Sequence, residues 1–463
     1  MRILFISPAS EEVLAMGWKK SWFASYCVRK TLFNYSKLTL GSLASALPPG
    51  HEVILHDESL GPVRTDMDVD LVGISVLTST APRAYHLADE FKRHGRKVIF
   101  GGIHATLMPD EALEHCDSVV LGEAEPVMHS VVEDASKGCL KRVYGPSEPF
   151  NLGMLKPPRR NLLKFSGIGN VEAVQTSRGC MGFCEFCSVS SFYKHVYRTR
   201  PIDSLIDEIM SIPSRNIVFV DDNFTAVKEH AYQVAEKMAE TKKRWFCFVD
   251  SNSALDRRLM RMLYRGGCRG VSIGFESINE NSLIEVEKFR ARAKHYREAL
   301  KNLEKEGLLT VVCFIFGFDS DDKNIFKNTL DFCFDNRVPV ASFNVLVPYP
   351  GTPLFKRLEK EGRILTRDWS RYIWYRAVYE PKQMSSRELE EGMFWAREKF
   401  FSNGRILERF CRALKFSMSF KESFIFLSFL AGYRFRTNLV RQMLRDENRF
   451  FCTNFVPQAQ LNF

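Results

Sequence analysis

Three cysteines lie within eight residues of the chain. Cys180, Cys184 and Cys187 have a C-x3-C-x2-C spacing, and the aromatic Phe186 directly precedes the last one. Three thiolates this close can hold one metal centre, but a four-iron cluster has four ligands, so one iron would remain open for chemistry. The alternatives are three unrelated buried cysteines or a zinc site, which would need a fourth ligand such as the nearest histidine, His195.

The chain before the cysteines has the pattern of an open α/β domain. In residues 1–145 short apolar runs alternate with helical patterns, which predicts a doubly wound, Rossmann-like parallel sheet. The predicted strands are Ile3–Ser7, Val53–His56, Leu71–Ser75, Val98–Gly101 and Ser118–Leu121. Ligands of such sheets bind beyond the carboxyl ends of the strands, where glycine permits close approach. The polar and glycine residues found there are Ser75, Thr78, Gly101, Gly102, Gly122 and Glu123.

The cysteines themselves lie in a second α/β region. Residues 146–170, with Pro149, Pro157 and Pro158, are predicted to be a linker. Residues 171–362 contain six strand–helix units, which predict a partial (β/α)6 barrel of the TIM type, and residues 363–463 form a helical region. The predicted barrel strands are Glu172–Gln175, Ile217–Val220, Trp245–Val249, Gly270–Phe275, Thr310–Phe316 and Ser342–Val347. The cysteines follow the first strand, so we expect them at the carboxyl face, where barrel active sites lie.

Other chemical groups follow later barrel strands. The residues concerned are Asp222, Glu276, Ser277 and Gly317. An acidic residue at such a place is commonly a helix N-cap. Their order after the cysteine triplet, however, resembles that of the radical S-adenosylmethionine (SAM) superfamily. The resemblance implies that the three cysteines bind a catalytic [4Fe-4S] cluster and that SAM chelates its fourth iron. It also implies that Phe186 and the four strand-end residues contact SAM.

The first domain resembles the cobalamin-binding domain of cobalamin-dependent radical SAM enzymes. The resemblance lies in Gly101-Gly102 and in the Gly122-Glu123-Ala124-Glu125 segment, and it implies that the strand-end residues of this domain bind cobalamin. The D-x-H-x-x-G motif, whose histidine binds cobalt in other cobalamin domains, is absent from it, so we expect no histidine from that motif on cobalt. The alternative is a degenerate Rossmann-like domain kept for packing. His104 is interpreted as a packing or surface residue.

Together these resemblances imply a radical SAM enzyme that uses cobalamin. In that family the reduced cluster cleaves SAM to a 5′-deoxyadenosyl radical, which removes hydrogen from an unactivated carbon. The commonest reaction then methylates that carbon, so the predicted activity is that of a C-methyltransferase. A cyclisation or rearrangement without methyl transfer uses the same machinery and stays open. A non-catalytic corrinoid-binding or sensor protein is a different class, against which the cysteine triplet argues.

Composition restricts the location and the partners. The apolar start is too short for a secretory signal, and the other cysteines do not repeat the cluster spacing, so we expect a cytoplasmic protein without a second cluster. No compact nucleic-acid-binding module is visible, so no specific nucleic acid is expected. The expected partners are a small-molecule or lipid-like substrate and an electron donor such as flavodoxin or ferredoxin.

The last 63 residues are basic and aromatic. They contain ten basic and four acidic residues, a net charge of +6, together with 12 of the 38 phenylalanines. Amphipathic helices of this composition can bind an anionic membrane surface, which would make the protein membrane-associated. The same periodicity arises when helices cap a barrel with their apolar faces. We favour the cap, with peripheral membrane contact as the alternative.

Overall fold

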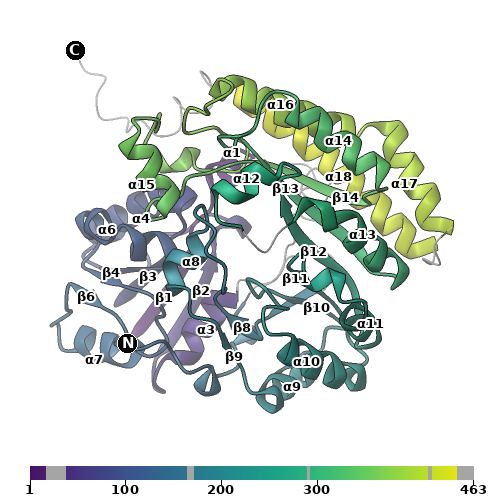
Figure 1. Ribbon diagram of the computed structural model, residues 1–463. Helices are drawn as coiled ribbons and strands as arrows, with labels where there is room; N and C mark the ends of the chain where they lie inside the picture. Colours follow the sequence, from purple (N-terminus) through teal and green to yellow (C-terminus); the bar gives the residue numbers. More distant parts are fainter. Residues whose placement is uncertain (17–37, 164–170, 289–291, 416–419, 446–463) are drawn as a thin grey trace.

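The computed structural model describes residues 1–16, 38–163, 171–288, 292–415 and 420–445. Residues 164–170 of the predicted linker and 416–419 and 446–463 of the predicted tail therefore lie outside the described residues. The described chain contains two six-stranded parallel sheets and a group of C-terminal helices (Figure 1). This arrangement confirms the predicted fold class.

The N-terminal sheet has the strand order β2-β1-β3-β4-β5-β6. Its strands are β1 Arg2–Ser7, β2 Glu52–Asp57, β3 Leu71–Ser75, β4 Lys97–Gly101, β5 Ser118–Val120 and β6 Val143–Tyr144. The first five match the predicted strands, whereas a two-residue strand such as β6 has no periodic pattern to reveal it. The strand order reverses between β1 and β3, and such a reversal is where open α/β sheets bind ligands.

Helices cover both faces of this sheet. They are α1 Glu11–Met16, α3 Leu38–Ala46, α4 Ala81–Arg93, α5 Ile103–Leu107, α6 Pro109–His115 and α7 Met128–Ser136. Alternate residues of β1 face different cores: Ile3 and Phe5 pack with α3 and α7, whereas Leu4 and Ile6 pack with α4 and α6. A strand buried on both sides has to be apolar throughout, which explains the continuous apolar runs of the sequence.

The central sheet has the strand order β14-β13-β12-β11-β10-β7, with parallel neighbours throughout. Its strands are β7 Val171–Val174, β10 Asn216–Phe219, β11 Arg244–Val249, β12 Cys268–Glu276, β13 Leu309–Phe316 and β14 Val340–Val345. Its helices are α9 Ile202–Ser211, α10 Lys228–Thr241, α11 Arg257–Arg265, α12 Glu280–Glu285, α13 Tyr296–Lys305, α14 Ile325–Asp335 and α15 Pro353–Lys360. Within the described residues β7 and β14 are the two outer strands, so the sheet is a partial barrel.

A short antiparallel ribbon joins β7 to the cysteines. It consists of β8 Ser177–Arg178 and β9 Arg198–Thr199, and the loop that it closes contains the helix α8 Ser188–Tyr193. Two-residue strands of this kind again have no periodic signal in the sequence. The ribbon fixes where the cysteine loop leaves the barrel and where it returns.

The C-terminal helices lie along the β14 side of the barrel (Figure 1). They are α16 Ser386–Phe400, α17 Asn403–Lys415 and α18 Phe420–Arg445. α16 contacts β14 and α14, and α18 contacts both α16 and α17. Phe400, Phe401 and Leu430 are buried in the barrel core. These contacts confirm the predicted cap for the described part of the tail, and none of the helices described is long and apolar enough to cross a membrane.

Several basic side chains of the cap are used inside the protein. The Arg409 guanidinium lies 3.6 Å from the centre of the Phe400 ring and donates to the Phe400 carbonyl at 2.9 Å. Arg405 lies 4.1 Å from the centre of the Phe334 ring, and Arg434 donates to a backbone carbonyl just beyond α16. Cation–π contacts and long aliphatic stems let arginine cover apolar surface. Part of the charge that suggested membrane contact therefore stabilises the cap.

We predict that Phe400→Ala destabilises the protein by about 3–5 kcal/mol, because it removes a fully buried ring and leaves a cavity under Arg409. Chemical denaturation of the purified protein measures the loss. The control is Leu407→Ala in α17, whose side chain is 59% exposed and whose replacement should change stability by at most about 0.5 kcal/mol. Equal effects of the two substitutions would show that the cap is not packed on the barrel.

Candidate active site

The cysteine loop comprises residues 179–197. A Cβ added to Gly182 would lie 3.4 Å from the Cys180 sulfur and 3.8 Å from the Cys184 sulfur, so both sulfurs lie beside this residue. All three cysteines, Cys187 included, are free and half-buried. The loop lies at the carboxyl end of β7, where the sequence places it.

Burial raises the pKa of all three thiols. It raises the pKa of the Cys184 thiol to about 12, although nearby Lys288 acts in the opposite direction. Burial also raises the pKa of Cys180 and Cys187, and the negative charge of Asp222 raises the pKa of both thiols further. Metal centres bind thiolates, so a positively charged centre has to displace these protons.

The residues of the loop fit an iron–sulfur cluster. Within the described residues no three histidine, cysteine or acidic side chains converge closely enough to hold one metal ion. A four-iron cluster binds each thiolate through a different iron, so its ligands do not have to meet at one point. The ring of His195, the candidate fourth ligand of a zinc site, stacks on Phe183 at 4.5 Å, and its Nδ1 lies 3.1 Å from the Gly182 carbonyl.

The second barrel strand is followed by two acids beside the loop, of which Asp221 is buried and Asp222 is exposed. Asp222 accepts a hydrogen bond from the Gly179 N–H at 3.0 Å, at the start of the cysteine loop. Asp221 accepts from the N–H groups of Thr176, at 2.8 Å, and Ser177. Burial raises the pKa of Asp221 to about 7, and partial loss of solvent contact raises the pKa of Asp222. Asp221 therefore binds the backbone just after β7, while Asp222 binds the first residue of the cysteine loop, directly before Cys180.

Glu276 ends β12 and forms an ion pair that the sequence does not reveal. Its φ of 62° is unusual for a residue with a side chain, and the pairing of β12 with β13 is irregular just before it. The carboxylate pairs with Lys288, whose Nζ also donates to the Gly274 carbonyl at 3.1 Å. Burial opposes the charged lysine, but Glu276 and Cys184 outweigh it and raise the pKa of Lys288. A lone lysine after a helix has no distinguishing pattern, so sequence reasoning misses it.

Three other predicted SAM contacts take part in packing. The Ser277 hydroxyl accepts from the Asn279 N–H at 3.0 Å. Gly317 has a φ of 106°, and a Cβ there would lie 2.4 Å from the Tyr379 hydroxyl. Phe186 is half-buried and packs against the barrel core. Packing thus explains these residue types, and their roles toward SAM stay predictions.

The middle of the cysteine loop is bound to the end of the barrel. Arg357 of α15 donates to both carboxylate oxygens of Glu185 at 3.1 Å and to Asp319 at 2.8 Å. Burial opposes the charge of Asp319, but hydrogen bonds from Arg363, Lys382 and Arg357 lower its pKa to about 2. Bidentate pairs between guanidinium and carboxylate are directional, so they fix the loop geometrically.

At the predicted cobalamin site, glycine and hydroxyl residues hold the strand ends together. Gly102 has a φ of 93°, and a Cβ there would lie 2.9 Å from the backbone of Val76, so only glycine fits this approach. The Thr78 hydroxyl lies 3.3 Å from Nδ1 of His104. His104 is fully buried and its Nε2 lies 3.0 Å from the Tyr85 hydroxyl, which confirms the packing interpretation.

The remaining predicted cobalamin contacts lie at the same edge of the sheet. Ser75 and Gly101 end β3 and β4 in paired register, and Gly122 follows β5 with a φ of 69°. Glu123 is buried, and its carboxylate pairs with both arginines of the β8–β9 ribbon. The structure therefore brings these residues together, and it gives Glu123 partners in the other domain that the sequence does not indicate.

A second contact joins the first domain to the segment that follows the barrel. The Tyr85 hydroxyl donates to Glu111 at 2.9 Å, and the Trp369 indole N–H donates to the same carboxylate at 2.6 Å. Trp369 belongs to a 3-10 turn, η7 Trp369–Arg371, that follows the barrel.

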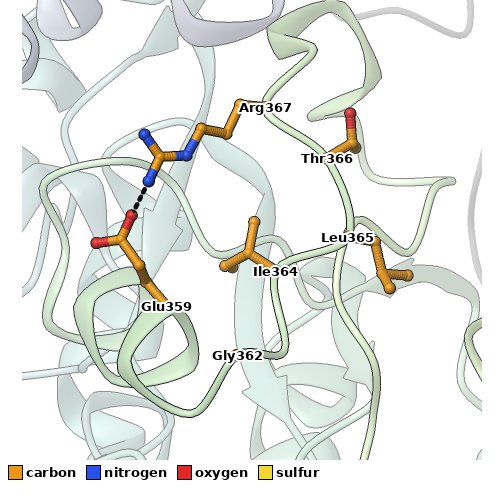
Figure 2. Close-up of a pocket in the computed structure, with 6 residues that line it drawn as sticks. All are labelled: Glu359, Gly362, Ile364, Leu365, Thr366 and Arg367. Atoms are coloured by element: carbon orange, nitrogen blue, oxygen red, sulfur yellow. Dashed lines mark hydrogen bonds and ion pairs between the residues drawn. The ribbon is translucent and has the colours of Figure 1, made fainter.

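A separate surface depression, shown in Figure 2, lies at the end of α15 and is lined by none of the predicted site residues.

Comparisons with known proteins agree with this architecture. The model of the radical SAM superfamily matches residues 174–333, and that of the B12-binding domain matches residues 28–132. TsrM, a radical SAM methyltransferase from Kitasatospora setae solved with cobalamin and a [4Fe-4S] cluster, has a TM-score of 0.66 at 16% identity, and the match covers 97% of this chain and 100% of that one.

Curated relatives agree as well. Bacteriochlorophyllide d C-12(1)-methyltransferase of Chlorobaculum tepidum is 31% identical over 350 residues, 73% of this chain and 76% of that protein. Bacteriochlorophyllide d C-8(2)-methyltransferase of the same organism is 27% identical over 365 residues, 74% of this chain and 80% of that protein. The chain belongs to the cobalamin-dependent radical SAM family. Its cofactors are a [4Fe-4S] cluster, SAM and cobalamin, and its reaction is the methylation of carbon.

One buried acid beyond the cysteine loop leads to a prediction on pH. Asp321 accepts hydrogen bonds from the Ser282 hydroxyl at 2.7 Å and the Gly317 N–H at 3.0 Å, and burial raises its pKa to about 7. The folded protein therefore binds a proton that the unfolded chain loses near its ordinary pKa of about 4. Between about pH 4 and 7 the unfolding free energy of the wild type should fall, relative to Asp321→Asn, as pH rises. Denaturation of both proteins across this range measures it; parallel pH profiles would contradict the prediction.

Proposed function

We propose that the substrate methylated by this enzyme is a tetrapyrrole. The observation that carries the proposal is the pair of curated relatives, which the alignments cover over three quarters or more of their length and which are both named for bacteriochlorophyllide d. A tetrapyrrole is large, planar and mostly apolar, so its binding site needs exposed apolar side chains beside the cofactors.

Exposed apolar side chains at the strand ends support this substrate class. Leu77 after β3 is 54% exposed and Phe183 of the cysteine loop is 58% exposed. Trp374 is 55% exposed and lies at the end of β14, where its carbonyl accepts from the Val345 N–H at 2.9 Å. Its indole N–H donates to the Tyr349 hydroxyl at 3.1 Å, which orients the ring. Aromatic faces presented in this way can stack on a planar conjugated ring.

The roles of individual residues belong to the same proposal. Cys180, Cys184 and Cys187 hold the cluster, and Asp222 and Glu276 bind polar groups of SAM. When bound, the cluster and SAM supply the radical that removes hydrogen, and cobalamin supplies the methyl group. The protein orients the carbon between the two domains and excludes water from it. Lys288 pairs with Glu276 and so holds its carboxylate in place at the end of β12.

We predict that Cys184→Ala loses the cluster, whereas Glu276→Gln keeps it and loses SAM affinity. Removing one of three thiolates leaves too few ligands, so iron and the thiolate-to-iron absorbance should disappear. Replacing a charged acceptor by a neutral one should weaken SAM binding by about tenfold or more. Iron analysis and equilibrium binding of SAM give the two readouts.

The matched control for the first substitution is Cys333→Ala, which removes a fully buried cysteine of α14 outside the loop. It should leave iron content unchanged. Full iron content in Cys184→Ala, or unchanged SAM affinity in Glu276→Gln, would overturn the corresponding assignment.

The substrate is tested with the anaerobically reconstituted enzyme, SAM carrying a deuterated methyl group, and bacteriochlorophyllide d. We expect a pigment that has gained one deuterated methyl group, detected by mass spectrometry, and no such product with Cys184→Ala. Release of 5′-deoxyadenosine without a labelled pigment would exclude this substrate. A pigment that loses hydrogen and gains no label would instead indicate cyclisation.

A further inference from the structure

The cysteine loop closes on a ribbon whose two strands are in close contact. Ser177 pairs with Thr199, and Arg178 pairs with Arg198. Gly179, the first residue of the loop, has a φ of 88°, and a Cβ there would lie 2.0 Å from the Val196 carbonyl oxygen. The loop can therefore close only when both ends of the ribbon are held in this register.

The ribbon places two like charges directly opposite each other. Arg178 and Arg198 are cross-strand neighbours, and their side chains are only 8% and 16% exposed. Like charges directly opposite destabilise a pair of strands, and burying an unpaired charge is costly. Within the barrel, Arg178 has the neutral Gln175 as a hydrogen-bond acceptor at 2.9 Å, and Arg198 lies 5.6 Å from the centre of the Tyr193 ring. These contacts do not neutralise the pair, so the ribbon requires anions.

The carboxylates that pair directly with these arginines come from the cobalamin-binding domain. Glu123 lies 2.7 Å from Arg178 and 2.6 Å from Arg198, and so bridges the two strands. Glu125 lies 2.6 Å from the other terminal nitrogen of Arg178. Between the domains, Phe150 donates its N–H to Glu123 at 3.1 Å and accepts from Arg198 at 2.7 Å. Burial opposes the charge of Glu125, but Arg178 outweighs it and lowers the pKa of this carboxyl.

We propose that Glu123 and Glu125 are positioning residues that set the register of the cysteine loop against the cobalamin-binding domain. The two acids pair with the arginines of both ribbon strands. This one ion-pair cluster therefore defines where the iron–sulfur site lies relative to cobalamin. The inference uses the cofactors of the family and is independent of the proposed tetrapyrrole. Glu123 then acts through Arg178 and Arg198 and does not contact cobalamin directly.

The test is hydrogen–deuterium exchange of the full-length protein, with and without hydroxocobalamin. Glu125→Gln preserves the size of the side chain and removes its charge, so amides of residues 177–199 should exchange about tenfold faster. Glu123→Gln should accelerate exchange of these amides more than Glu125→Gln does, because Glu123 pairs with both arginines. Glu125→Asp retains the charge and should restore part of the protection. Hydroxocobalamin uptake should remain in Glu125→Gln, because the proposal gives this residue no contact with the cofactor.

The matched control is Glu306→Gln. Glu306 pairs with two arginines, Arg257 at 2.6 Å and Arg261 at 3.2 Å, and its side chain is about as buried as that of Glu123. It should leave exchange in residues 177–199 unchanged. Unchanged exchange there in a folded Glu125→Gln protein, or an equal rise over the whole chain, would overturn the proposal. Loss of cobalamin uptake in Glu123→Gln with normal exchange of the loop would also overturn it and assign Glu123 to the cofactor.

Discussion

Two buried arginines that face each other across a ribbon constrain the whole active site. Arg178 and Arg198 repel each other, and the barrel that contains them supplies no carboxylate within hydrogen-bonding distance of them among the described residues. Their partners are acids of the other domain, at least 53 residues earlier in the chain. The loop with the cysteines is therefore completed at the boundary between two domains and not within one.

The rest of the loop is held by the same kind of interaction. Asp222 binds the backbone at its start, and Arg357 binds Glu185 between the second and third cysteines. Apart from Phe186, which packs against the barrel core, the contacts described for this loop are mainly polar. Hydrogen bonds between charged groups are directional, and they can fix such a loop with few contacts. This explains why charged residues cluster around the cysteines.

The sequence predicts the parts that have a local signal. The strands of both sheets except β6 can be predicted because each is a short apolar run between helical patterns, and the cysteine triplet can be predicted because its spacing is specific. The sequence does not reveal the ribbon, because its strands have two residues each. It does not reveal the role of Lys288 either, because that role depends on Glu276, which is 12 residues away. Gly317 and Ser277 match the pattern of the family, yet packing against Tyr379 and a turn at Asn279 already account for these two residue types. The tail was ambiguous because arginine and phenylalanine suit a membrane and a packed cap equally.

An ionic boundary also suits the chemistry. In a radical methylation the carbon that loses hydrogen is also the carbon that receives the methyl group, so residues of both domains would have to hold their cofactors around one carbon atom. Misplacement by about 1 Å can cost about a hundredfold in rate. A purely apolar interface is non-directional and tolerates small sliding, whereas Glu123 accepts from two fixed guanidinium groups and permits only one register. The acids of the glycine–glutamate segment thus fix the two domains in one alignment through Arg178 and Arg198.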